Sequence, residues 1–121
     1  MAAIIPAPAA LAARRPAASD AIDTTLAIVS DHFDVSIADI MSLRRTRSVL
    51  PARHVALHLA LKISGETPQE VGRRIGGKDY TSVLLADRTM RRLADSDPAH
   101  ARLLRELERR CMMDNHPESL A

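Results

Sequence analysis

The chain has 121 residues, a formal net charge of +2 and 46% hydrophobic residues, which fits one small domain with a buried core. No stretch approaches the roughly 20 apolar residues of a membrane-spanning helix, so the sequence excludes a helical span. Its single cysteine, Cys111, excludes an intramolecular disulfide and a multi-cysteine zinc site, and is typical of a reducing compartment. Aromatic residues make up only 2%, so the core must consist of aliphatic residues and methionine, which favours helices.

Basic residues are concentrated in the middle of the chain. Residues 44–92 contain eleven lysines and arginines against four acidic residues, a local net charge of +7. The rest of the chain carries six basic and eleven acidic residues, or −5. Such asymmetry favours a polyanionic partner for the middle segment. Charge alone leaves open a second interpretation, in which the arginines form a solvated helical surface.

The two ends of the chain differ from its centre. Residues 1–19 are rich in alanine and proline, and the repeated prolines prevent a continuous helix. Because this segment has little apolar surface to bury, we predict a disordered N-terminal tail. We predict an all-α domain of about five or six helices at residues 20–113, with a flexible C-terminal tail at 114–121.

Apolar residues at three- and four-residue steps predict the first two helices. The first runs over residues 20–32, and its inner face consists of Ile22, Leu26, Val29 and Phe33. A short helix follows, capped by Ser36 with Asp39 at the third position.

A long helix is predicted within the segment 44–64. Pro51 lies in its first turn, and the Ser-Gly pair at 64 and 65 ends it. Its inner face consists of Val49, Ala52, Ala56, Leu59 and Ile63. Three arginines fall just before this helix, where they could bind a phosphate backbone: Arg44, Arg45 and Arg47.

The remaining segments predict three further helices. Thr67 caps the first of them and Glu70 reaches back as its capping-box partner, while the glycines at 76 and 77 end it. Asp79 caps the next helix, whose predicted inner face is Val83, Ala86, Met90 and Leu93. The last helix covers residues 98–113, with an inner face of Ala101, Leu104, Leu107 and Cys111.

Two helices joined by a tight glycine turn are a helix-turn-helix candidate, in which the second helix places its first residues in the major groove of DNA. Residues 78–82 occupy that position. Lys78 and Tyr80 can contact phosphates or bases, and the hydroxyls of Thr81 and Ser82 can bond to either. The alternative is an ordinary helical hairpin whose polar residues are caps.

The run of residues 44–86 resembles the C-terminal DNA-binding domain of the bacterial chromosomal replication initiator, DnaA. That family has an arginine cluster before a long helix, followed by a Gly-Gly-Arg-Asp-His-Thr-Thr-Val signature. Here residues 76–83 read Gly-Gly-Lys-Asp-Tyr-Thr-Ser-Val. The likeness extends over residues 20–93, and the signature is specific.

The resemblance implies roles for particular residues. Arg47 matches the family's arginine that enters the minor groove, and Asp79, Thr81 and Ser82 match its signature contacts in the major groove. Together with the charge pattern, this predicts a set of DNA-binding residues: Arg44, Arg45, Arg47, Arg53, His54, Lys78, Asp79, Tyr80, Thr81, Ser82 and Arg88.

This sequence also departs from the family's pattern. Lys78 stands where the family has arginine, and Tyr80 replaces its histidine, which predicts an altered DNA site. Leu85 stands where a polar surface residue is expected, and it indicates a partner contact. The ATPase module of the full-length family members is expected to be absent, because the sequence has no Gly-x-x-x-x-Gly-Lys-Ser/Thr loop.

No catalytic or metal-binding group stands out in the sequence. His54 and His58 have a spacing that can bind zinc, but no further ligand accompanies them, and we expect both on an exposed polar face with His54 near DNA. No nucleophile, base and orienting acid can be assigned to one site. We therefore expect no enzymatic activity, cofactor, metal or small-molecule substrate.

We predict a stand-alone, replication-initiator-like domain that binds double-stranded DNA sequence-specifically and regulates replication initiation or transcription at the cytoplasmic nucleoid. The alternative is a protein-interaction module that keeps the fold, binds DNA weakly and contacts a replication or regulatory protein. A weaker alternative is association of the basic surface with anionic membranes.

Overall fold

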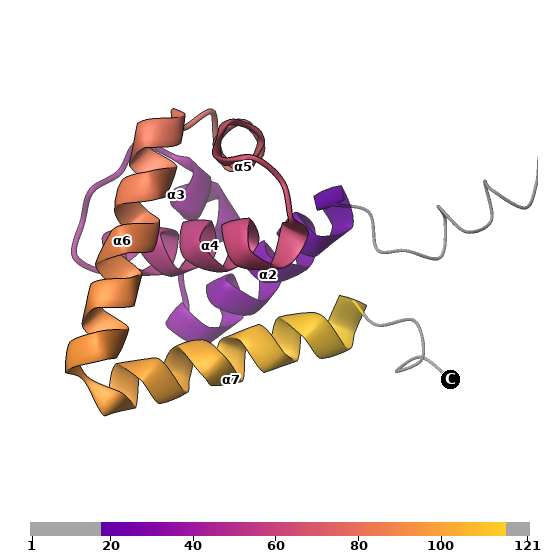
Figure 1. The fold of residues 1–121 in the computed structure, drawn as a ribbon. Helices are drawn as coiled ribbons and strands as arrows, with labels where there is room; N and C mark the ends of the chain where they lie inside the picture. Colours follow the sequence, from indigo (N-terminus) through magenta and orange to yellow (C-terminus); the bar gives the residue numbers. More distant parts are fainter. Residues whose placement is uncertain (1–17, 116–121) are drawn as a thin grey trace, which may run out of the picture.

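The computed structural model describes residues 18–115, most of which lie in six helices (Figure 1). These are α2 (Ala18–Phe33), α3 (Ile37–Met41), α4 (Val49–Ser64), α5 (Pro68–Arg74), α6 (Tyr80–Ser96) and α7 (Pro98–Asn115). Within this range no residue lies in a strand, so the predicted all-α fold is confirmed. Most of the two predicted tails lies outside the described residues. Residues 18–19 and 114–115, which were predicted to belong to the tails, are instead the ends of α2 and α7. None of the described helices is long and apolar enough to cross a membrane.

Helix α4 lies at the centre of the fold, packed between α2 and α6 (Figure 1). It is buried over most of its surface, and Ala52, Ala56 and Ala60 are fully buried. Small side chains allow neighbouring helices to approach closely, because the distance between helix axes depends on the side chains at the contact. Helix α7 packs across α2 and α6 and completes the core with Leu104, Leu107 and Cys111.

Three predicted helix caps are confirmed. The side-chain oxygens of Ser36, Thr67 and Asp79 each accept a hydrogen bond from the backbone N–H three residues later, at 3.0, 3.2 and 2.9 Å. The capping-box role predicted for Glu70 is wrong, because its carboxylate accepts from Arg73 Nε at 3.0 Å instead. A guanidinium one turn away is a stronger partner for a carboxylate than a neutral backbone amide.

The predicted inner faces are largely confirmed, with one error at the end of α6. Val83, Ala86 and Met90 are buried as predicted, but Leu93 is 40% exposed. Ala94 packs against the core in its place. Three turns of an α-helix advance about 10.8 residues, so the face that begins at Val83 reaches Ala94 rather than Leu93.

The glycine pair forms the sharp turn between α5 and α6. Gly76 and Gly77 have φ angles of +79° and +70°, in the left-handed region that favours glycine. The N–H of Lys78 then donates to the carbonyl of Gly72 at 2.8 Å, which closes the turn back on α5. The predicted end of α5 is confirmed, and the turn directs the first residues of α6 toward the domain surface.

Candidate nucleic-acid interface

Three segments meet along one edge of the domain. They are residues 42–48 between α3 and α4, which we call the basic loop, and the first turns of α4 and α6. A groove of about 220 Å³ lies between them and is lined by Leu43, Arg45, Leu50, Arg53, His54, Leu57, Lys78, Ser82 and Leu85. In Figure 1 the basic loop arches beside α6. The fold thus brings two separate groups of predicted DNA-binding residues onto one surface.

The arginines of the basic loop are exposed to solvent. Arg44 Nε lies 3.9 Å from a carboxylate oxygen of Asp39, a loose ion pair. Arg45 and Arg47 form no ion pair with any residue that the structure describes. Because no carboxylate neutralises these two guanidinium groups, they remain available to a phosphate backbone.

The start of α6 presents polar groups to solvent. Tyr80 is 50% exposed, and Thr81 and Ser82 are also exposed. The carboxylate of Asp79 is occupied as the helix cap, and Arg88 is exposed two turns further along α6. Free N–H groups give the start of a helix a partial positive charge, so this surface favours anionic oxygens.

Two predicted contact residues point into the protein. Arg53 is only 6% exposed, and its Nε and Nη2 donate to the carbonyls of residues 40 and 39 at 2.7 and 2.9 Å. Lys78 is half-buried, and its Nζ donates to the carbonyl of Met41 at 2.7 Å. Burial lowers the pKa of both groups, and the charge of Arg53 lowers the pKa of Lys78 further. The fold therefore withdraws these two cations from the outer surface.

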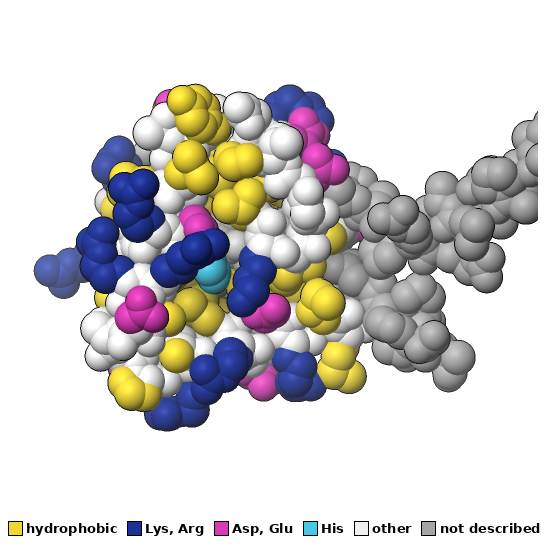
Figure 2. All heavy atoms as spheres, viewed as in Figure 1, with side chains coloured by type: hydrophobic (Ala, Val, Ile, Leu, Met, Phe, Trp, Pro, Cys, Tyr) yellow, Lys and Arg dark blue, Asp and Glu magenta, His cyan; other side chains and the backbone are white. Residues whose placement is uncertain are grey.

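Ten of the eleven cations of residues 44–92 fall into two groups, and the eleventh, Arg44, has only the loose ion pair with Asp39. Those with a close carboxylate partner are Lys62, Arg73, Arg74 and Arg91. Those without an ion-pair partner among the described residues are Arg45, Arg47, Arg53, Lys78, Arg88 and Arg92. In Figure 2, Lys and Arg side chains gather at the left over α6 and the basic loop, while hydrophobic side chains lie exposed over the start of α6. Three of the cations without an ion-pair partner, Arg45, Arg53 and Lys78, line the groove.

His54 lies in the groove, half-buried beside two arginines. Burial lowers the pKa of its imidazole, and the charges of Arg53 and Arg45 lower it further. The imidazole is therefore neutral at neutral pH and gains a charge only under more acidic conditions.

The pKa of His54 predicts a stability loss on acidification. Its folded-state pKa is below that of an unfolded imidazole, so the unfolded chain binds the proton first as the pH falls. The contribution of neutral His54 to the free energy of unfolding is complete above the pKa of the unfolded state. It is lost as the pH falls through that pKa and then through the pKa of the folded state. We expect the free energy of unfolding to fall more between about pH 7 and about pH 5 in the wild type than in His54→Gln. Urea denaturation of both proteins at both pH values measures this difference, and equal pH dependence would contradict it.

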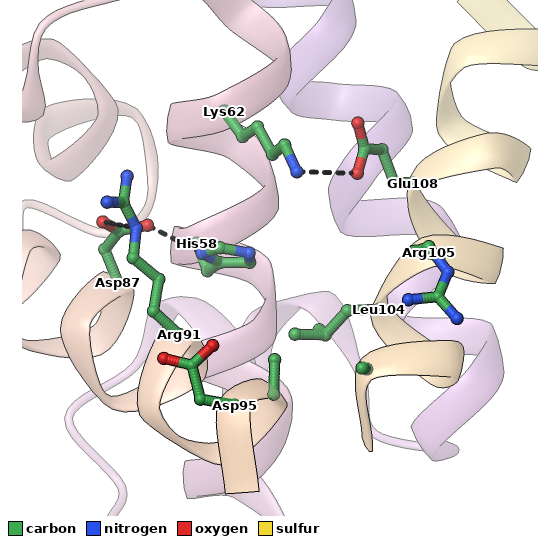
Figure 3. A pocket seen from close by; sticks show the side chains of 10 residues that line it. His58, Lys62, Asp87, Arg91, Asp95, Leu104, Arg105 and Glu108 are labelled. Atoms are coloured by element: carbon green, nitrogen blue, oxygen red, sulfur yellow. Dashed lines mark hydrogen bonds and ion pairs between the residues drawn. The ribbon is translucent and has the colours of Figure 1, made fainter. Parts of the chain in front are cut away.

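His58 does not lie on an exposed face, so that expectation was wrong. It is 7% exposed, and its Nδ1 lies 2.7 Å from a carboxylate oxygen of Asp87. The other Asp87 oxygen pairs with Arg91 Nε at 3.0 Å. These groups border a cavity of about 380 Å³ between α4, α6 and α7, where Lys62 and Glu108 also pair at 3.1 Å (Figure 3). Most charges at this second site neutralise one another.

The groove also contains a residue that the sequence analysis missed. Leu43 is 84% exposed within the basic loop, and Leu85 on α6 is 56% exposed across the groove from it. Leu85 was singled out because an apolar residue was unexpected there. The signal for Leu43 was of the same kind, an apolar side chain beside a run of arginines in a segment with no helical pattern.

Comparisons with known proteins identify the family of this chain. A family model described as the bacterial dnaA protein helix-turn-helix matches residues 22–90. The chain is 40% identical over 88 residues to the chromosomal replication initiator protein DnaA of Xanthobacter autotrophicus, covering 73% of this chain and 17% of that protein. Over 81 residues it is 42% identical to the Brucella abortus DnaA, covering 67% of this chain and 16% of that protein. The chain thus spans about a sixth of the length of the curated relatives it matches.

Proposed function

The chain belongs to the bacterial DnaA helix-turn-helix family, and from this premise we propose that it binds double-stranded DNA in a sequence-specific manner. One observation carries the proposal. The exposed start of α6 and the exposed arginines of the basic loop lie on one edge of the domain, and among the described residues Arg45 and Arg47 have no carboxylate partner. A surface with exposed hydroxyls and unneutralised guanidinium groups suits the bases and phosphates of a duplex.

The two halves of this surface suit the two grooves of DNA. The first turn of α6 enters the major groove, where Tyr80, Thr81 and Ser82 meet base edges and phosphates. The basic loop lies beside α6 and reaches the adjacent minor groove with Arg47, while Arg44 and Arg45 bind the flanking phosphates. Arg88 and His54 border the same surface. Asp79 supports the contact as the cap that fixes the helix start.

The proposed cellular role follows from the relatives. They are named chromosomal replication initiators, and the matched region is their helix-turn-helix. Occupation of initiator-type sites on the bacterial chromosome would regulate replication initiation or transcription, and it would place the protein at the nucleoid. The proposed activity is binding and requires no catalytic group or cofactor.

Duplex selection followed by mutagenesis tests the proposal. Bound duplexes are selected from a random pool, and the affinity of the wild type for the recovered site is measured at low and high salt. We expect affinity to fall steeply with salt and to stay well above that for random duplex. Arg47→Ala and Thr81→Ala should each weaken binding to the selected site by about tenfold, the effect of losing one good base contact.

Arg109→Ala is the matched control. It removes the same charge as Arg47→Ala, but Arg109 lies on α7, pairs with Glu106 and does not line the groove. This variant should bind the selected site about as well as the wild type. If Arg47→Ala and Thr81→Ala also retain full affinity, the proposed contacts are wrong. If no motif is recovered and binding depends only weakly on salt, the protein-interaction function is favoured instead, with the exposed Tyr80 and Leu85 as its contact surface.

A further inference from the structure

We infer that Arg53 and Lys78 position the basic loop against the start of α6, by donating hydrogen bonds to the last three carbonyl groups of α3. This inference rests on the proposed DNA-binding function, and it assigns both residues a positioning role in place of direct DNA contact.

The contacts converge on one short stretch of backbone. Arg53 donates from Nη2 to the carbonyl of Asp39 at 2.9 Å and from Nε to that of Ile40 at 2.7 Å. Lys78 donates from Nζ to the carbonyl of Met41 at 2.7 Å. The three carbonyls are consecutive and belong to the last turn of α3, so two cations from different elements satisfy the end of one short helix.

The arrangement has a clear electrostatic basis. The final carbonyls of a helix have no intrahelical partner, and they carry a partial negative charge. Cations at this end are therefore favourable, and charge-assisted hydrogen bonds are stronger than neutral ones. Helix α3 has only five residues and would be marginal alone. Ser42 also donates to the Asp39 carbonyl, from its N–H at 3.1 Å and its Oγ at 2.7 Å. The side-chain donors from outside α3 are Arg53, which reaches the carbonyls of Asp39 and Ile40, and Lys78, which reaches that of Met41.

The position of α3 determines the position of the basic loop. The loop begins at Ser42, directly after the last of the three carbonyls. Lys78 is the residue immediately before the cap of α6, so its bond to Met41 joins the loop's starting point to the recognition turn. Gly76 adds a direct backbone approach, because a Cβ at that position would lie 1.9 Å from the Met41 carbonyl oxygen. The spacing between the loop arginines and α6 is thereby fixed before DNA arrives.

Limited trypsin digestion tests the inference without DNA. The basic loop carries three cleavage sites, at Arg44, Arg45 and Arg47, and mass spectrometry identifies cleavage at each. Lys78→Met keeps an unbranched apolar side chain, one atom shorter than that of lysine, and removes the donor. We expect cleavage within the loop to become several-fold faster in this variant, because local opening becomes easier while the rest of the core remains folded. Lys78→Arg restores a donor and should restore the protection.

Arg88→Met is the control, since Arg88 is an exposed α6 cation that forms no hydrogen bond or ion pair with any residue that the structure describes. Loop cleavage in this variant should equal that of the wild type. Arg53→Met should accelerate cleavage as Lys78→Met does, but it also removes a buried group, so its global stability is measured alongside. Unchanged loop cleavage in Lys78→Met would overturn the inference.

A double-variant cycle on the selected duplex gives the second test. If Lys78 acts through the loop, Lys78→Met should weaken binding less in an Arg47→Ala background than in the wild type. For Arg88→Met combined with Arg47→Ala, the fold-loss in duplex affinity should equal the product of the two single fold-losses, as for two independent contacts. If the fold-losses in affinity of Lys78→Met and Arg47→Ala also multiply, Lys78 contacts DNA directly and the positioning role is overturned. Failure of the wild type to bind any duplex would refute the proposed function, while the digestion result would still report on the anchoring of the loop.

Discussion

Gly76→Ala is expected to destabilise the domain by about 2–5 kcal/mol. Gly76 has a φ angle of +79°, and a left-handed conformation costs an alanine about 1–2 kcal/mol. The added Cβ would also lie 1.9 Å from the carbonyl oxygen of Met41 and 2.8 Å from Lys78 Nζ. Overpacking adds about 1–3 kcal/mol, because the Met41 oxygen belongs to the main chain and can move only if α3 or the basic loop shifts.

Gly77→Ala provides the matched control for this prediction. Gly77 has a φ angle of +70°, but a Cβ added there would meet no described atom within 4 Å. Only the conformational cost of about 1–2 kcal/mol should appear. Chemical denaturation of both variants, followed by circular dichroism of the helices, measures the difference. If both variants lose the same free energy of unfolding, the glycine turn does not pack tightly against α3. That result would also weaken the proposed link between the turn and the basic loop.

Asp87→Ala is expected to cost about 3 kcal/mol, at the upper end of the range for leaving a buried polar group without its hydrogen-bond partner. The side chains of His58 and Asp87 are only 8% and 13% exposed and lie 2.7 Å apart. Removal of the carboxylate leaves the Nδ1 of His58 buried without this partner, and an unsatisfied buried polar group is costly.

Two further variants separate the buried pair from the outer charge. Arg91 pairs with the same carboxylate but is 73% exposed, so Arg91→Ala should cost less than about 1 kcal/mol. Asp87→Asn retains an oxygen that can accept from His58 and should recover part of the loss. Urea denaturation at neutral pH gives all three free energies of unfolding. The prediction fails if Asp87→Ala is no more destabilising than Arg91→Ala.

The sequence itself determined the helices and most of their ends. Caps at Ser36, Thr67 and Asp79 depend on atoms three residues away, and the turn at Gly76 and Gly77 depends on the φ angles that glycine permits. Such local interactions can be recognised from a short stretch of sequence. The family signature at residues 76–83 is local in the same sense, which is why the family assignment made from it agrees with the comparisons.

Predictions of side-chain exposure from charge and polarity were wrong where burial depended on residues distant in the sequence. His58 was expected on a polar face, yet it is buried because Asp87, 29 positions later in the chain, supplies its partner. A partial signal was present, since Asp87 lies one turn after Val83 on the inner side of α6, and an inward-facing carboxylate requires a partner. The identity of that partner depends on how α4 and α6 pack.

The tertiary structure alone decided which cations remain free for a polyanion. By type and position in the sequence, Arg53 and Lys78 were equivalent to Arg45 and Arg47. They differ because the end of α3 is folded against them, 13 and 37 positions away in sequence, and offers carbonyl groups that need donors. A net charge counts side chains wherever they lie, whereas the strength of a hydrogen bond depends on distance and burial, and only the packed fold sets these.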